Sequence, residues 1–123
     1  MIIGLGIDVV ELDRIERIWD RFGLRFARRI LTSQELDRFP RNAVAYLASR
    51  FAAKEAGVKA LGTGFSQGIT FHCLEVGSEG SGKPNLTFFR AAEQRAGDLS
   101  VSRVHLSITH DRSVSAAVVV LEA

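Results

Sequence analysis

The sequence predicts one α+β domain, residues 1–123, in which mostly antiparallel strands surround a long central helix. Three observations favour this class. Short apolar runs rich in β-branched residues have the length of strands. One pattern of period 3.6, between residues 42 and 61, is long enough for a helix of several turns. Turn-forming segments at residues 77–84 and 110–113 separate neighbouring strand-like runs closely enough for hairpins.

The composition is that of an ordinary globular protein. The chain has 123 residues, 46% of them hydrophobic and 24% charged, which excludes a disordered or fibrous protein. Its longest apolar runs, such as residues 116–121, are far shorter than the roughly 20 residues of a membrane span. Met1 leads into the first strand without the basic segment of a signal peptide, and Cys73 is the only cysteine. We therefore expect a cytosolic protein with no disulfide and no membrane partner.

The positive charge is concentrated in one segment. Six arginines lie between Arg14 and Arg29, where only Glu16 and Asp20 oppose them. Arginine suits bidentate contacts with phosphates and carboxylates. Two interpretations stay open from composition alone: a solvated, arginine-rich helix face, or a docking surface for an acidic partner.

The first strand is expected at residues 2–10, a run with five β-branched side chains that we expect to be buried. From residue 11 to residue 22 apolar side chains recur at helical spacing, and Gly23 supplies the stop. Residues 24–31 add one or two helical turns. On the first of these helices Arg14, Arg17 and Arg21 share one face.

The central helix has recognisable ends. Thr32 and Glu35 form a capping-box pattern for a short helix that stops before Pro40. Asn42 then caps the long helix, which Gly62 ends after residue 61.

The C-terminal half is expected to contain four strands and a short helix. In the last hairpin, alternation puts apolar residues 104, 106 and 108 on one face and polar residues 105, 107 and 109 on the other. The expected segments are a loop at 62–68, strands at 69–76 and 85–89 around a turn at 77–84, a helix at 90–96 stopped by Gly97, and strands at 104–109 and 114–121 around a turn at 110–113.

Two carboxylates occupy positions where apolar residues are expected. Asp8 interrupts an apolar strand, and Glu55 continues the apolar stripe of the central helix. Burying an unpaired carboxylate costs several kcal/mol or shifts its pKa. Each position also has a simpler interpretation: Asp8 caps the following helix, or Glu55 pairs with Lys59 one turn later.

A hard divalent cation between Asp8 and Glu55 would explain both positions. Magnesium takes one or two protein carboxylates together with substrate phosphates, and Lys59 could hold a phosphate beside it.

The glycine-rich loop after residue 61 is not a P-loop, because it follows a helix. His105 and His110 lack a third ligand for zinc, so each either contacts phosphate or is structural, and Cys73 is interpreted as a core residue.

Five segments, in order along the whole chain, resemble the signatures of the 4′-phosphopantetheinyl transferases. The resemblance is to their small trimeric class, the holo-acyl-carrier-protein synthases, and it implies their fold. The segments are GIDVVELDRI at residues 6–15, RFARRILT at 25–32, RFAAKEAGVKALG at 50–62, GKP at 82–84 and SITH at 107–110.

The resemblance implies a transferase of fatty acid biosynthesis. Such enzymes move phosphopantetheine from coenzyme A to a serine of apo acyl carrier protein and release adenosine 3′,5′-bisphosphate. Asp8 and Glu55 would then bind magnesium on the pyrophosphate of coenzyme A, and Lys59 would stabilise the leaving charge. Glu55 and a metal-bound water are both candidates for the base that takes the serine proton.

The resemblance also implies a homotrimer with a coenzyme groove between subunits. The hairpin at residues 104–121 would meet a neighbouring subunit, and the loops at residues 62–64 and 83–84 would line the groove. The residues implied for coenzyme binding are Arg50, Lys59, Gly62, Gly64, Lys83, Pro84, His105 and Thr109, and those implied for docking the carrier are Arg14, Arg21 and Arg25. Residues 38–44 lack a cluster of basic residues, which leaves the contacts of the 3′-phosphate open.

A small binding module for RNA or single-stranded DNA is the rival interpretation. It would use the arginine face, with Trp19, Phe22 and Phe26 stacking on bases. Two observations oppose it. Trp19 and Phe22 lie on the apolar stripe of their helix, and Asp8 and Glu55 would have no role. We therefore expect no nucleic-acid partner.

Overall fold

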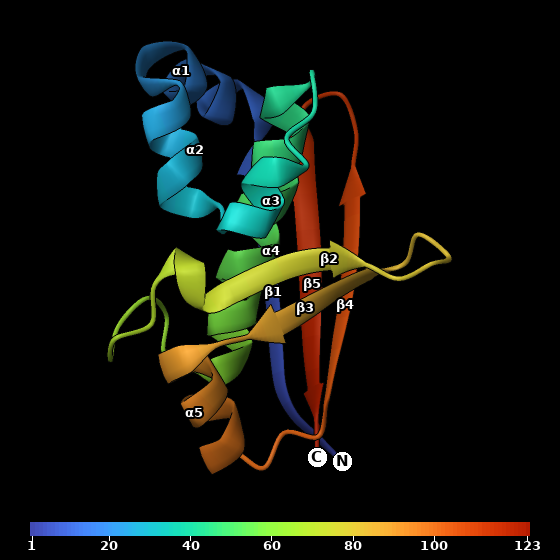
Figure 1. The fold of residues 1–123 in the computed structure, drawn as a ribbon. Coiled ribbons are helices and arrows are strands. Elements are labelled where there is room, and N and C mark those ends of the chain that lie inside the picture. The colour runs from blue at the N-terminus through green and yellow to red at the C-terminus, as the bar shows by residue number, and fades with distance from the viewer.

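The computed structural model describes residues 1–123 (Figure 1). Four helices follow the first strand, and a three-stranded sheet is completed only by the last two strands. The elements are β1 (Ile2–Glu11), α1 (Leu12–Phe22), α2 (Leu24–Ile30), α3 (Ser33–Asp37), α4 (Ala43–Leu61), a 3-10 turn (Phe71–Cys73), β2 (Leu74–Ser78), β3 (Pro84–Phe88), α5 (Arg90–Asp98), β4 (Arg103–His110) and β5 (Val114–Glu122).

The sheets are antiparallel, as predicted. The larger one has the order β1-β5-β4, and β2 and β3 form a separate hairpin. In Figure 1 the long helix α4 lies along one face of the larger sheet, and the β2–β3 hairpin runs across it. Helices α1, α2 and α3 gather at one end of the molecule, whereas α5 lies at the other end beside both termini.

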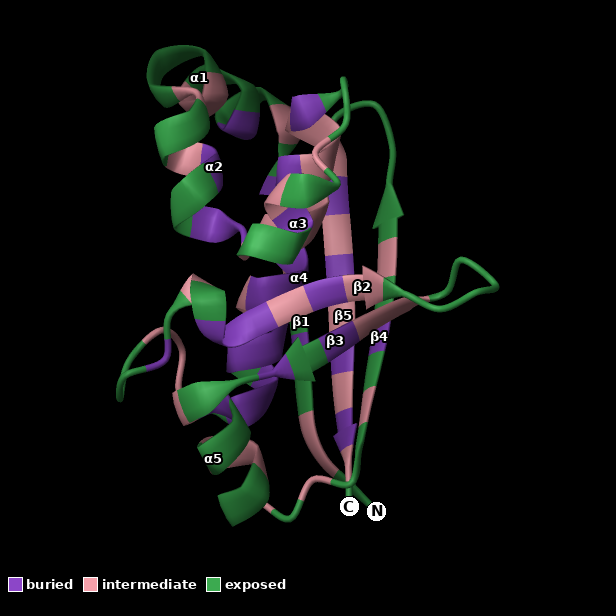
Figure 2. Cartoon of the chain, in the orientation of Figure 1, coloured by how far each residue is buried: buried purple, intermediate pink, exposed green.

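Helix α4 is the centre of the core. It is apolar on nearly every side, which is typical of a helix surrounded by other elements, and Lys59 is its one exposed residue. Figure 2 shows buried residues concentrated in α4 and alternating along β5. The predicted caps are confirmed, because Asn42 accepts a hydrogen bond from the backbone N–H of Ala45 and Gly62 adopts a left-handed φ of 78°.

Glycine brings β1 directly against α4. A Cβ at Gly6 would collide with the backbone carbonyl of Ala56, and one at Gly4 would collide with that of Ala60. No other residue type allows this approach, because even alanine carries that Cβ. The contact lays β1 along the second half of α4, and Asp8 follows Gly6 on the strand as Glu55 precedes Ala56 on the helix.

Three expectations about the elements were wrong. One face of β1 is exposed, because nothing in a single chain covers its apolar side chains Leu5, Ile7 and Val9. Residues 69–73 are not extended, since a 3-10 turn lets Phe71 stack against neighbouring aromatic rings before β2 begins. Helix α5 continues through Gly97 to residue 98, and Ser100 adopts the left-handed conformation that ends it, with a φ of 61°.

The core contains a buried ion pair, which the sequence did not predict. The ammonium group of Lys54 lies 2.6 Å from a carboxylate oxygen of Glu35, and their side chains are 0% and 1% exposed. Burial lowers the pKa of Lys54, and the charge of Glu35 opposes that shift. No helix of the molecule has both the length and the hydropathy needed to cross a bilayer.

Candidate active site

The structure brings Asp8 and Lys59 into direct contact. The ammonium group of Lys59 lies 3.2 Å from Oδ1 of Asp8, and it donates a second hydrogen bond to the backbone carbonyl of Ile7 at 3.0 Å. Asp8 does not cap α1, because the N-cap of that helix is Glu11. Asp8 therefore stays a candidate site residue on β1, and Lys59 reaches it from the last turn of α4.

Glu55 lies one helical turn before Lys59 and shares the electrostatic environment of Asp8. Burial raises the pKa of Glu55, and the nearby Asp8 carboxylate raises it further, against the opposing charges of Lys59 and Arg14. A carboxyl group whose ionisation is disfavoured by a neighbouring carboxylate is well suited to share a cation with it. Neither here nor elsewhere in the chain are three or more histidines, cysteines or carboxylates grouped so that they could hold a metal ion by themselves.

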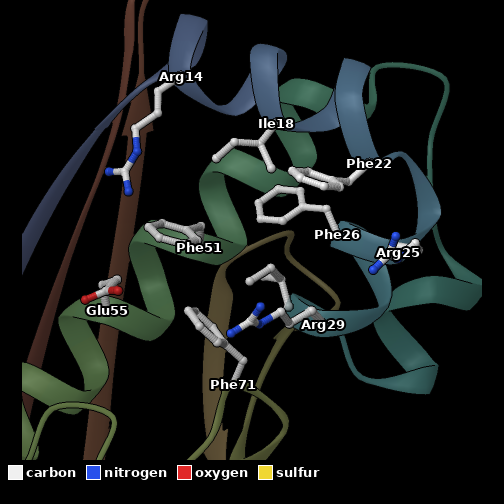
Figure 3. A pocket seen from close by; sticks show the side chains of 10 residues that line it. Arg14, Ile18, Phe22, Arg25, Phe26, Arg29, Phe51, Glu55 and Phe71 are labelled. Atoms are coloured by element: carbon white, nitrogen blue, oxygen red, sulfur yellow. The ribbon is translucent and has the colours of Figure 1, made fainter.

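A cavity of about 500 Å³ opens beside Glu55. Its walls are apolar side chains of α1, α2 and α4, and its rim carries arginines. In Figure 3 Arg14 and Glu55 lie on one side of the cavity, with phenylalanine rings between them and Arg25. The lining residues are Arg14, Ile18, Phe22, Arg25, Phe26, Arg29, Ile30, Phe51, Glu55 and Phe71.

Two of the three predicted docking arginines line this cavity. Arg14 and Arg25 are lining residues, whereas Arg21 stacks its guanidinium group 5.3 Å from the ring centre of Phe22. The aromatic residues differ from what base stacking would need. Trp19 packs against Phe39, with ring centres 5.5 Å apart, and of the three proposed stacking residues only Phe22 is exposed.

A second cavity, of about 410 Å³, lies between the first half of α4, the β2–β3 hairpin and the end of β4. Arg50 lines it, with its guanidinium carbon 4.0 Å from the ring centre of Tyr46 and one N–H donated to Ser49 Oγ at 2.9 Å. The Nε atom of Arg50 is buried without a partner. The second cavity therefore holds a fixed cation with an unused donor, which suits an anionic ligand.

The other residues implied for coenzyme binding are distributed unevenly. Pro84 lines the second cavity, and Lys83 precedes it at the exposed hairpin turn. Gly62 and Gly64 follow the C-terminal end of α4, beyond Lys59, and line neither of the two cavities.

His105 and Thr109 lie on the outer face of the sheet, away from the second cavity. The Nε2 atom of His105 lies 3.0 Å from Glu122 Oε1, and Thr109 is exposed. Their role therefore stays a prediction that depends on another copy of the chain. His110, not His105, lines the second cavity, together with Tyr46, which the sequence did not single out. Strand alternation was the available signal, because residues 104, 106, 108 and 110 face the same way.

This architecture is that of a known transferase family, and the sequence matches it over nearly its full length. The model of the 4′-phosphopantetheinyl transferase superfamily matches residues 4–119, so the chain belongs to this family. A holo-[acyl-carrier-protein] synthase of Maridesulfovibrio salexigens is 57% identical over 123 residues, covering 99% of each chain.

Solved structures show the same fold. The crystal structure of holo-[acyl-carrier-protein] synthase from Neisseria meningitidis superimposes with a TM-score of 0.93 at 42% identity, covering 100% of both chains. The enzyme from Bacillus anthracis, in complex with CoA (3′,5′-ADP), gives a TM-score of 0.83 at 38% identity, covering 100% of this chain and 98% of that one. The fold class and the family resemblance predicted from the sequence are thereby confirmed.

Proposed function

We propose that this chain transfers the 4′-phosphopantetheine group from coenzyme A to a serine hydroxyl of apo acyl carrier protein, for fatty acid biosynthesis. The observation that carries the proposal is the meeting of Asp8, Glu55 and Lys59 beside an arginine-rimmed cavity. The names of its relatives, and the coenzyme bound to the Bacillus anthracis protein, support the same substrate pair. Residues 1–123 act as one catalytic domain in the cytosol, where the free thiol of Cys73 stays reduced.

The reaction forms one P–O bond and breaks another. The serine oxygen attacks the phosphorus that carries the pantetheine arm, and the pyrophosphate bridge breaks. Adenosine 3′,5′-bisphosphate leaves with the bridging oxygen, and the serine proton passes to a base, for which Glu55 is one candidate. Such a step depends on positioning and charge neutralisation more than on covalent chemistry by the protein. Lys59 is 52% exposed, so its ammonium group can turn from Asp8 to the departing phosphate.

Asp8 and Glu55 would hold the magnesium ion that the family resemblance implies. Their fit to the ion rests on their carboxylate oxygens and on the way Asp8 disfavours the ionised form of Glu55. When bound, magnesium supplies neutralisation of the pyrophosphate charge. Glu55 also lines the cavity of about 500 Å³, which supports it as a candidate base for the serine of the carrier.

The proposal includes a homotrimer whose coenzyme groove lies between subunits. Arg50 and Glu55 line different cavities of one chain. A single coenzyme molecule that contacts both residues would therefore take Glu55 from one copy and Arg50 from another. The outer face of β1 supplies an apolar surface for assembly, since Leu5, Ile7 and Val9 are 66%, 63% and 59% exposed. His105 and Thr109 would enter the groove from that face.

The arginines that line the cavity beside Glu55 would dock the carrier protein. Arg14 and Arg25 border a depression that is apolar inside, which fits an amphipathic, acidic surface.

The proposed reaction is tested by measuring the release of adenosine 3′,5′-bisphosphate by chromatography. It should require the protein, coenzyme A, magnesium and apo carrier together. Release that is independent of the carrier would indicate a hydrolase instead.

A further inference from the structure

The buried carboxylate of Glu35 is bonded on all sides. Its Oε1 accepts hydrogen bonds from the Lys54 ammonium group at 2.6 Å and from the backbone N–H of Thr32 at 2.8 Å. Its Oε2 accepts one from the backbone N–H of Val76 at 2.7 Å. One side chain thus joins the start of α3, the middle of α4 and strand β2.

Lys54 connects this cluster to Glu55, one of the two carboxylates proposed to hold magnesium. Its ammonium group also donates to the backbone carbonyl of Ile30 at 2.6 Å, so Lys54 is held from two directions. The next residue along α4 is Glu55. A helix that is fixed in rotation and depth at one residue is fixed at the next one too, because its backbone is continuous and rigid.

The backbone of Glu35 connects the same cluster to Arg50, which the family resemblance implies for coenzyme binding. The Tyr46 hydroxyl donates a hydrogen bond to the carbonyl oxygen of Glu35 at 2.7 Å. One turn later on α4, the guanidinium group of Arg50 rests on the ring of Tyr46, 4.0 Å from its centre. Holding the ring therefore limits where Arg50 can lie.

Stability alone is a weak reason for this arrangement. Replacing a buried ion pair with apolar residues of similar volume is often neutral or stabilising, because removing two charges from water opposes their attraction. The Thr32 hydroxyl further donates to Glu75 at 2.6 Å, so the charged cluster extends to the protein surface. What an ion pair adds over apolar packing is a fixed geometry, since charged hydrogen bonds are short and directional.

We propose that Glu35 is a positioning residue for Glu55 and Arg50, the two residues of α4 that would bind the metal and the coenzyme. This inference rests on the proposed function. Through Lys54 it sets the place at which α4 presents Glu55. Through Tyr46 it sets the guanidinium group of Arg50. Nothing in the cluster touches the reacting atoms, so its effect is on the binding of coenzyme A and its metal.

The two connections are tested separately, by calorimetry of coenzyme A binding without carrier protein. The double variant Glu35→Gln/Lys54→Met removes both buried charges together, so the protein still folds. It should need severalfold more magnesium for half-maximal binding of coenzyme A. The variant Tyr46→Phe keeps the ring and loses only the tether. It should raise the Kd of coenzyme A by up to about fivefold at saturating magnesium, the equivalent of one hydrogen bond, without changing the magnesium requirement.

The matched control is Glu75→Gln, which removes an acidic charge that also acts on Lys54 but takes part in none of the hydrogen bonds of Glu35, Lys54 or Tyr46. It should leave both binding parameters at wild-type values. Melting temperatures distinguish positioning from stability, since a purely structural role would lower them and leave binding unchanged. Wild-type binding parameters in either test variant would overturn the inference. Failure of the wild-type protein to modify a carrier would overturn the proposed function instead, and the binding comparison would still be readable.

Discussion

Lys59 and Asp8 are partners across two elements that are 51 residues apart in sequence, with 3.2 Å between Nζ and Oδ1. The pair exists because two glycines of β1 allow the strand to lie directly on α4. Asp8 is 16% exposed while Lys59 is 52% exposed, so the carboxylate is fixed and the ammonium group is free to move. This asymmetry suits a site in which Asp8 holds a cation and Lys59 follows a phosphate.

The first prediction concerns the two carboxylates. Asp8→Asn and Glu55→Gln keep the side-chain shape and remove the anionic charge, so each should lower turnover by about two orders of magnitude or more. Initial rates over a magnesium titration, with circular dichroism to verify the fold, measure this. Glu93→Gln, an exposed acid-to-amide change on α5, is the matched control and should behave as wild type. Near wild-type turnover of either site variant at limiting magnesium would refute the metal assignment.

The second prediction concerns pH. Burial and the Asp8 charge both raise the pKa of Glu55, so this carboxylate takes up a proton at a higher pH than an ordinary glutamate does. Only the ionised form can bind a cation, and magnesium affinity should therefore fall as the pH decreases through that raised pKa. Carbon NMR of the Glu55 carboxyl group should show its pKa decreasing in Asp8→Asn, yet staying above the usual value because burial remains. An unchanged pKa in that variant would mean that the two carboxylates do not interact.

The third prediction concerns assembly. Light scattering should give three times the 13.5 kDa mass of the chain, and Ile7→Glu on the exposed face of β1 should reduce it to one chain. Mixing subunits provides a sharper measurement. Glu55→Gln and Arg50→Ala proteins are each expected to be inactive, and exchanged trimers should regain activity, because one copy supplies Glu55 and another Arg50. No recovery after proven subunit exchange would contradict a groove shared between copies.

The fourth prediction separates docking from chemistry. Reversing Arg14 and Arg21 together to glutamate should increase the KM for the carrier steeply and leave the affinity for coenzyme A nearly unchanged. Exposed charges mainly raise encounter rates, and salt screens them over about 8 Å, so added salt should have the same effect on the native protein. Arg90→Glu on α5, at the other end of the molecule, is the control. Lost coenzyme binding with normal carrier affinity would assign these arginines to the nucleotide.

The sequence predicted the elements and caps well because these depend on local patterns. Asp8 and Glu55 were found for the same reason, as charges that break an apolar period. The partner of Lys54 could not be predicted, since a charged residue in a helix ordinarily faces water and its contact with Glu35 is made only by the tertiary fold. The sequence does not distinguish the exposed face of β1 from a buried one, because its apolar side chains have the composition of a strand covered by its own chain.

The role of His105 stays a prediction of the family resemblance. The strand β4 extends to residue 110, and its alternation puts residue 105 on the outer face of the sheet and residue 110 on the inner one. The structure gives His110 a place in the second cavity and pairs His105 with Glu122. Whether His105 contacts the coenzyme therefore depends on the assembly, which the subunit-mixing measurement addresses.

The most direct test of the central claim is intact-mass spectrometry of apo acyl carrier protein after incubation with this protein, coenzyme A and magnesium. The carrier should gain the mass of one phosphopantetheine group, and a carrier whose acceptor serine is replaced by alanine should gain nothing. The Glu55→Gln enzyme should leave the carrier unmodified over the same time. An unchanged carrier mass with the wild-type enzyme, under conditions where coenzyme A is bound, would contradict the account.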